Sequence, residues 1–203
     1  MRLISNTTER LGDDLKTELH SGSKLRIAAS TFSIFAFEAL REELEQIEEL
    51  EFVFTSPAFT PANTGDKIRR ERREFFIPSG HAESSLYGTD FEIRLRNKLT
   101  QRAIAKECAS WVRRKVIFRS NATGQMMQPM MIADDRAGYF APQGFTTADL
   151  GYEQGNAMSS MVTKLEGATE TKQLLDTFDQ IWNTPGHLTD VTQAVHDHIA
   201  AVY

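Results

Sequence analysis

The chain is poor in the residues that build covalent crosslinks and metal centres. Its 203 residues include one cysteine, Cys108, and five histidines. A single cysteine cannot form a disulfide within the chain, so we expect a protein of an intracellular, reducing compartment. Two of the histidines, His196 and His198, stand close together in a predicted helix. Residues two apart on a helix do not share a face, so we predict no metal site.

Long hydrophobic runs are missing as well. No stretch approaches the roughly 20 apolar residues of a membrane span, and the start, MRLISNTTER, lacks the apolar core of a signal peptide. The phosphate-binding pattern Gly-x-x-x-x-Gly-Lys-Ser/Thr does not occur, so this chain by itself is not expected to hydrolyse ATP. We therefore predict a cytoplasmic protein without a membrane partner, whose domain needs no cofactor.

The chain does contain enough apolar residues for one substantial core. Hydrophobic residues occupy 40% of its positions, and a chain of this length forms one domain more often than two. We expect a single domain over residues 1–203.

Charge is distributed unevenly along the chain. The net charge is −5, but residues 67–119 hold 14 Lys and Arg against 6 Asp and Glu, a local balance of +8. Such a segment is typical of a phosphate-binding face, because sequence-independent DNA affinity comes from Lys and Arg against phosphates. The alternative is a set of helix surfaces paired with acidic neighbours.

The apolar pattern predicts an α/β fold. Leucines at helical spacing indicate a helix over residues 8–20, and a short apolar run at 25–30 is typical of a central strand covered on both faces. A helix over 34–48 and a strand over 51–56 follow, which completes a βαβ unit with parallel strands. Further strands are predicted over 116–119, 126–133, 138–142 and 157–164, and helices over 170–182 and 188–202.

The middle of the chain combines an irregular segment with a long helix. Residues 57–88 are rich in proline, glycine and serine and are expected to form an irregular surface insertion. Residues 90–114 carry apolar side chains near a 3.6-residue period, which predicts a long amphipathic helix. The candidate nucleic-acid-binding residues come from both parts: Lys67, Arg69, Arg70, Arg72, Arg73, Arg113, Arg114 and Lys115.

Two parts of the chain resemble a known family. The segments that carry the resemblance are KLRIAASTFSIFAFEALREELEQIEELEFVFTSP, FEIRLRNKLTQRAIAKECASWVRRKVIFRSN, GFTTADLG and FDQIWN. Over residues 24–57 and 90–203 the chain resembles the phospholipase D-like domain at the N-terminus of bacterial Swi/Snf-type (superfamily 2) DNA helicases. The resemblance implies a phospholipase D-like fold, in which helices flank a mixed β-sheet on both faces.

The resemblance also shows where reactive groups are missing. Enzymes of that superfamily carry His-x-Lys-x-x-x-x-Asp on one strand and Gly-Ser-x-Asn-Phe-Thr on the following turn. The His is the nucleophile on phosphorus, and the Lys, Ser and Asn hold and stabilise charge. Here residues 137–151 read AGYFAPQGFTTADLG, so that Pro142 replaces the Ser and Gly144 replaces the Asn.

The preceding strand has lost its reactive residues in either of two registers. In one register Gln128 stands for the His and Met130 for the Lys, and in the other Met127 and Pro129 do so. Asp134 or Asp135 lies near the Asp position. No histidine lies elsewhere in this strand or turn, so we predict that the domain has no catalytic residues.

The function predicted from these features is that of an accessory domain. We expect a catalytically inactive phospholipase D-like module that contributes DNA binding or assembly to a helicase motor, in the same polypeptide or in a partner. The full-length protein is then an ATP-dependent helicase, and this chain, which ends inside a predicted helix, is an N-terminal fragment of it. The alternatives are a protein-interaction module or a dimerisation module that forms a homodimer, in either case without DNA binding, and a residual phosphodiesterase or nuclease.

Overall fold

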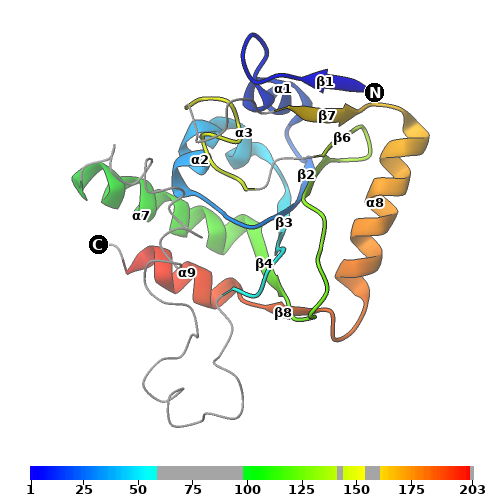
Figure 1. Cartoon of the computed structure of the whole chain (residues 1–203). Coiled ribbons are helices and arrows are strands. Elements are labelled where there is room, and N and C mark those ends of the chain that lie inside the picture. Colours follow the sequence, from blue (N-terminus) through cyan, green and yellow to red (C-terminus); the bar gives the residue numbers. More distant parts are fainter. Residues whose placement is uncertain (59–97, 141–143, 154–160, 202–203) are drawn as a thin grey trace.

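Eight strands of the described residues form one mixed sheet in the computed structural model, which describes residues 1–58, 98–140, 144–153 and 161–201 (Figure 1). The strand order is β1-β7-β6-β5-β2-β3-β4-β8. Strands β2, β3 and β4 run parallel, and the other neighbours pair antiparallel. The strands are β1 (Arg2–Ile4), β2 (Lys24–Ala29), β3 (Glu49–Phe54), β4 (Val116–Asn121), β5 (Met130–Ala133), β6 (Ala137–Phe140), β7 (Val162–Leu165) and β8 (Leu188–Asp190).

Helices cover both faces of this sheet. The described helices are α1 (Leu11–Glu18), α2 (Ile34–Ala39), α3 (Arg41–Gln46), α7 (Lys98–Lys115), α8 (Ala168–Asn183) and α9 (Thr192–Ala200). In Figure 1 the helix α8 stands alone on the right of the sheet, and α2, α3, α7 and α9 lie on its left. The expected fold class, an α/β fold with a mixed sheet flanked by helices on both faces, is confirmed.

The larger hydrophobic core is built around Phe32, which is fully buried at the end of β2. The centroid of its ring lies 5.5 Å from that of Phe52, 5.1 Å from that of Phe118 and 5.7 Å from that of Phe145. Trp111 of α7 stacks on it at 6.3 Å and donates a buried hydrogen bond of 2.8 Å from Nε1 to the Leu44 carbonyl. Strands, α3, α7 and the segment after β6 therefore meet at one aromatic centre.

The smaller core lies between the sheet and α8. Leu174, Phe178 and Trp182 of α8 are buried against the sheet residues that point to this side, among them Val53. The Arg119 guanidinium sits 4.0 Å from the centroid of the Trp182 ring. Because strand side chains alternate between the two faces, this packing leaves β2 and β3 covered on both sides, as their apolar sequences predicted.

The predicted βαβ unit is confirmed, with one difference in its helix. Strands β2 and β3 pair in parallel, with Leu25 opposite Leu50. The helix between them is broken at Leu40, whose φ of −112° and ψ of 19° are not helical. Leu40 and Leu44 are both fully buried, so the two short helices α2 and α3 place their apolar residues in the same core.

Other boundaries depend on pairing that a linear pattern cannot reveal. Strand β1 was not predicted, because its three residues show no period and it exists through its pairing with β7. The predicted strand over 126–133 is paired only from Met130, since Pro129 has no N–H to donate to a ladder. The start of the predicted helix over 188–202 is instead the edge strand β8, which pairs with β4, and Asp190 Oδ1 then accepts the N–H of Thr192 at 2.9 Å.

Several predictions fall on residues outside the described ranges. These are most of the insertion over 57–88, the first part of the helix over 90–114, the end of the strand over 138–142 and the start of the strand over 157–164. In the parts of the chain that are described, no helix combines the length and the hydrophobicity needed to cross a bilayer.

Candidate functional site

The turn singled out in the sequence is fastened to the end of β2 by backbone hydrogen bonds. The N–H of Phe145 donates to the Thr31 carbonyl at 2.7 Å, and the N–H of Ser33 donates to the Phe145 carbonyl at 2.9 Å. Residues 144–147 are all buried. This turn is therefore part of the core rather than a rim open to solvent.

A second set of contacts fixes the residues that follow. Thr146 Oγ1 donates to Asp149 Oδ2 at 2.8 Å and accepts the N–H of Asp149 at 3.1 Å, the second bond being of the kind that an N-cap side chain makes to the N–H three residues later. The Leu150 carbonyl accepts the N–H of Gly12 at 2.9 Å. The GFTTADLG segment thus links the end of β2 to the start of α1.

Gly144 stands where a side chain would be tightly packed. A Cβ added to this residue would lie 3.0 Å from Asp149 Oδ2 and 3.2 Å from Thr31 Cβ. These neighbours would have to shift by a few tenths of an ångström to admit it. The packing around Gly144 therefore suits glycine.

The residues that the sequence analysis placed at the catalytic positions are divided between the core and the surface. Met127 and Met130 are buried in the cluster under α8, whereas the Gln128 side chain is exposed. Asp134, with a φ of 53°, accepts hydrogen bonds of 2.8 Å from Ser23 Oγ and from the N–H of Lys24. Asp135 is exposed in the same turn. Residue 142 lies outside the described ranges.

Neither a metal-binding group nor a reactive thiol is found in the described ranges. They contain no group of three His, Cys, Asp or Glu side chains placed to hold a metal ion. Cys108 is fully buried in α7, and this burial raises the pKa of its thiol well above the ordinary value. A buried neutral thiol is a poor nucleophile.

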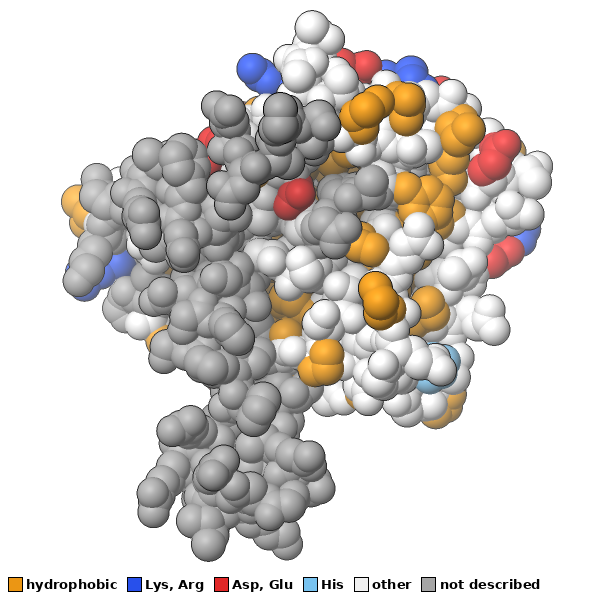
Figure 2. Space-filling view, in the orientation of Figure 1, with side chains coloured by type: hydrophobic (Ala, Val, Ile, Leu, Met, Phe, Trp, Pro, Cys, Tyr) orange, Lys and Arg blue, Asp and Glu red, His pale blue; other side chains and the backbone are white. Residues whose placement is uncertain are grey.

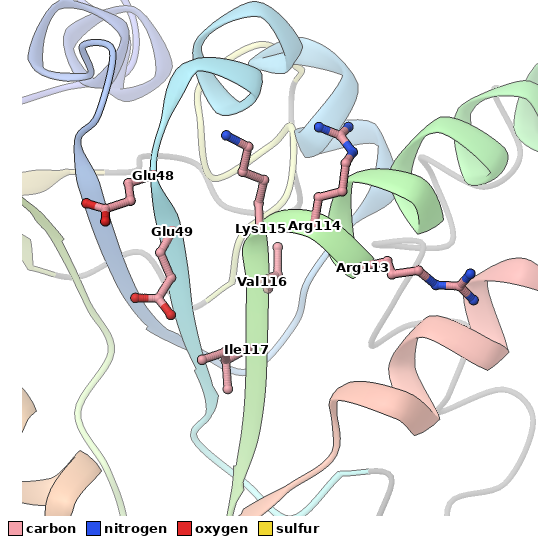
Figure 3. A pocket seen from close by; sticks show the side chains of 7 residues that line it. All are labelled: Glu48, Glu49, Arg113, Arg114, Lys115, Val116 and Ile117. Atoms are coloured by element: carbon pink, nitrogen blue, oxygen red, sulfur yellow. The ribbon is translucent and has the colours of Figure 1, made fainter.

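The basic residues at the end of α7 point in different directions. Figure 3 shows Arg113 directed toward α9, away from Arg114 and Lys115. Arg114 Nη2 pairs with Glu45 at 3.0 Å, and Lys115 Nζ donates to the Ile47 carbonyl at 2.7 Å. Two of the three cations are thus engaged within the protein. The other candidates, residues 67, 69, 70, 72 and 73, lie outside the described ranges.

The hollow beside these cations is of mixed charge. It has a volume of about 340 Å³ and is lined by Glu48, Glu49, Val116 and Ile117 in addition to the three basic residues. Its two carboxylates would repel an anion. On the side of the molecule seen in Figure 2, hydrophobic side chains gather in the middle and the described Lys and Arg side chains lie at the margins.

A buried charge cluster that the sequence analysis did not find joins α1 to β7. Lys164 is 4% exposed, and its Nζ lies 2.8 Å from Asp14 Oδ2, 3.0 Å from Glu18 Oε1 and 3.2 Å from Glu166 Oε1. Asp14 also accepts hydrogen bonds from the Tyr139 hydroxyl at 2.6 Å and from Arg2 Nη2 at 2.8 Å. The sequence signal that could have indicated this cluster is Lys164, a lysine at a core-facing position of a predicted strand.

The cluster shifts the pKa values of its members. Burial opposes ionisation of Lys164, but its hydrogen bonds to carboxylates outweigh burial and raise its pKa. Burial likewise opposes ionisation of Asp14, but hydrogen bonds from Lys164, Tyr139 and Arg2 lower its pKa. Burial and the bond to Asp14 raise the pKa of Tyr139. Each side chain is thus held in its ordinary charge state, which is typical of a structural cluster rather than an acid-base pair.

Comparison with known proteins gives similarity of backbone only. No family model matches the chain, and no curated protein matches it. It is similar to the crystal structure of phosphatidylserine synthase from Haemophilus influenzae Rd KW20, with 13% identity and a TM-score of 0.48 over 98% of this chain. This chain spans 42% of that one. It is also similar to TrmBL2, an archaeal chromatin protein whose structure shows a mode of DNA binding, with 12% identity, a TM-score of 0.39, and coverage of 90% of this chain and 52% of that one.

Proposed function

We propose that this chain is a catalytically inactive phospholipase D-like domain that contributes DNA binding or assembly to a helicase motor. The motor would lie in the same polypeptide or in a partner. The observation that carries the proposal is the state of the turn at Gly144, whose surroundings are filled by the Thr31 and Asp149 side chains. A turn packed in this way supports retention of the fold without its chemistry.

The inactive half of the proposal draws on the residues around that turn. A phosphodiesterase of this type needs an imidazole to attack phosphorus and donors to stabilise the pentavalent state. In the two possible registers these places are held by Met127 and Pro129, or by Gln128 and Met130. None of these side chains can serve as the nucleophile.

The DNA-binding half draws on charge. A balance of +8 over residues 67–119, in a chain with a net charge of −5, favours a local phosphate-binding face. The test is binding of the 203-residue chain to duplex and single-stranded DNA of the same sequence at two salt concentrations. Affinity that falls as salt rises supports the proposal, and undetectable affinity at low salt overturns its DNA-binding half.

A cleavage assay tests the inactive half separately. End-labelled DNA is incubated with the chain, with and without a chelator, and with an Asp135→Asn variant in parallel. We expect no cleavage in any sample, because no nucleophile is in place. Cleavage by the wild type that the variant loses would establish a residual nuclease instead.

A protein-interaction module is the second candidate, and exposed apolar side chains at one edge of the sheet favour it. Leu3 of the edge strand β1 is 59% exposed, and Met161, just before the neighbouring β7, is 53% exposed. Sedimentation at several concentrations distinguishes monomer from dimer. If the chain is a dimer, a Leu3→Lys substitution that converts it to a monomer and leaves DNA binding unchanged would favour this second function.

A further inference from the structure

Five of the six cations of α7, from Arg102 to Lys115, fall into two groups once their partners are known. The helix carries six Lys and Arg and a single carboxylate, Glu107. On the side that faces α3, the charges are paired: Glu107 bonds to Arg41 at 2.6 Å, and Arg114 bonds to Glu45. Lys115 is held by the Ile47 carbonyl. These groups hold the helix against its neighbours.

The second group is exposed and unpaired. Arg102, Lys106 and Arg113 are each exposed, and none forms an ion pair or a side-chain hydrogen bond with the residues that the structure describes. At about 100° per residue, the three side chains project within about 40° of one another around the helix axis. They therefore form one row, which we call the α7 stripe.

The dimensions of the α7 stripe are set by the helix. With a rise of about 1.5 Å per residue, Arg102 and Lys106 are separated by about 6 Å along the axis, and Lys106 and Arg113 by about 10 Å. The whole row spans about 16 Å, the length of about five base pairs of duplex at 3.4 Å each. Three phosphates of one DNA segment can thus lie against one straight helix face.

The stripe also lies on a stable support. Between its members the buried side chains of Cys108, Trp111 and Val112 anchor the opposite side of α7 in the larger core. One carboxylate near the stripe is Asp197 of α9. Hydrogen bonds with His196 and Gln193 lower the pKa of Asp197, and the charge of Arg113 adds to this effect.

We infer that the α7 stripe of Arg102, Lys106 and Arg113 is the surface that contacts the DNA phosphate backbone, and that Arg114 and Lys115 take no part. The inference rests on the proposed DNA-binding function and assigns it to residues. Charge complementarity selects the occupant: three cations in one row, none paired with a described residue, on a helix anchored in the core of an acidic chain fit a row of phosphates. The expected binding is independent of base sequence, because phosphate contacts carry no sequence information.

The experiment compares substitutions that remove the stripe with substitutions that remove paired cations. The test variant is Arg102→Gln, Lys106→Gln and Arg113→Gln together. The matched control also removes three charges, all of them paired within the protein: Arg41→Gln, Arg114→Gln and Lys115→Gln together. A third variant, Arg102→Lys, Lys106→Arg and Arg113→Lys, keeps the three positive charges and changes only the type of basic side chain. Glutamine has a helix propensity close to that of Lys and Arg, and circular dichroism verifies that each variant is folded.

The readout is the dependence of DNA affinity on salt. The slope of log K against log salt is negative, and each lost phosphate contact reduces its magnitude by about 0.9 for duplex and about 0.7 for single strands. Three lost contacts reduce the magnitude of the duplex slope by about 2.7, so the affinity advantage of the wild type over the test variant shrinks about 40-fold between about 50 mM and about 200 mM salt. The paired-cation control and the charge-preserving variant are expected to keep the wild-type slope.

The outcomes separate this inference from the proposed function. If the wild type binds DNA and the test variant keeps the wild-type slope, the stripe inference is overturned and the proposed function stands. A control variant that loses as much slope as the test variant also overturns it, because the effect is then one of net charge. If the wild type binds no DNA at low salt, both fail.

Discussion

The buried lysine of the charge cluster can be compared with an exposed lysine that has one carboxylate partner in place of three. Lys164 and Lys172 each form an ion pair of nearly equal length, 2.8 Å to Asp14 and 2.7 Å to Asp176. The Lys164 side chain is 4% exposed and the Lys172 side chain is 73% exposed. Replacing each by Met keeps the length of the side chain and removes the charge.

The expected magnitudes follow from what remains after each substitution. Breaking a buried ion pair costs about 3–5 kcal/mol, because the remaining charge is left without its partner. In Lys164→Met the carboxylate of Asp14 keeps its bonds from Arg2 and Tyr139, and Glu166 is 50% exposed and can reach water. We therefore expect the low end of that range, about 3 kcal/mol of unfolding free energy. Lys172→Met should cost about 0.5 kcal/mol or less, as exposed pairs one helical turn apart do.

The pH dependence of this difference has a definite sign. The lowered pKa of Asp14 in the folded state stabilises the protein above the unfolded value of about 3.9, and this stabilisation is lost as pH falls through the folded value. The raised pKa of Lys164 stabilises it below the unfolded value of about 10.4, and this stabilisation is lost as pH rises through the folded value. The penalty of Lys164→Met should be greatest between about pH 4 and about pH 10.

Urea unfolding followed by tryptophan fluorescence measures both variants. The two unfolding free energies are compared first at neutral pH and then at steps toward acid. We expect the Lys164→Met penalty to shrink toward acid, since a protonated Asp14 no longer needs the ammonium. Equal penalties for the two variants, or a Lys164→Met penalty that does not change with pH, would refute the reasoning.

Three further predictions concern packing. Gly138→Ala places a methyl 2.5 Å from Leu174 Cδ2 and should cost about 1–3 kcal/mol. In a Leu174→Ala background the same change should be near neutral, and a double-mutant cycle without coupling would contradict this. Trp111→Phe leaves the buried Leu44 carbonyl without its donor and should cost about 2 kcal/mol, so an unchanged urea midpoint would be evidence against it. The Cys108 thiol, fully buried and with a raised pKa, should react with a disulfide reagent only after denaturation; rapid reaction in native buffer would disprove its burial.

The hydrophobic pattern of the sequence was sufficient to predict a helix or strand wherever that element depends on residues close together in the sequence. The apolar run at β2 and the 3.6-residue period of α7 predicted a central strand and a long helix, because both signals arise from which side chains must leave water. The pattern also predicted the α/β class and the parallel β2–β3 pair, which are confirmed. The assignment of Gly144 to an asparagine position came from the resemblance alone and stays a prediction.

Long-range partners decided the rest. Strand β1 exists because β7, some 160 residues later, supplies its hydrogen bonds, and no local period encodes that pairing. Charge shows the same limit. Arg113, Arg114 and Lys115 are consecutive in sequence, and each carries one positive charge. Arg114 is paired with Glu45 and Lys115 donates to a backbone carbonyl, whereas Arg113 is exposed.

Composition alone located a basic segment, and the fold sorted its described members into those that bond to neighbouring elements and those that face solvent. The physical reason is that sequence specifies charge and hydrophobicity at each position, while the availability of a charge depends on which opposite charge the folded chain brings within bonding distance. Lys106 and Lys164 make the contrast plain: one is exposed on the α7 stripe, and the other is buried among three carboxylates.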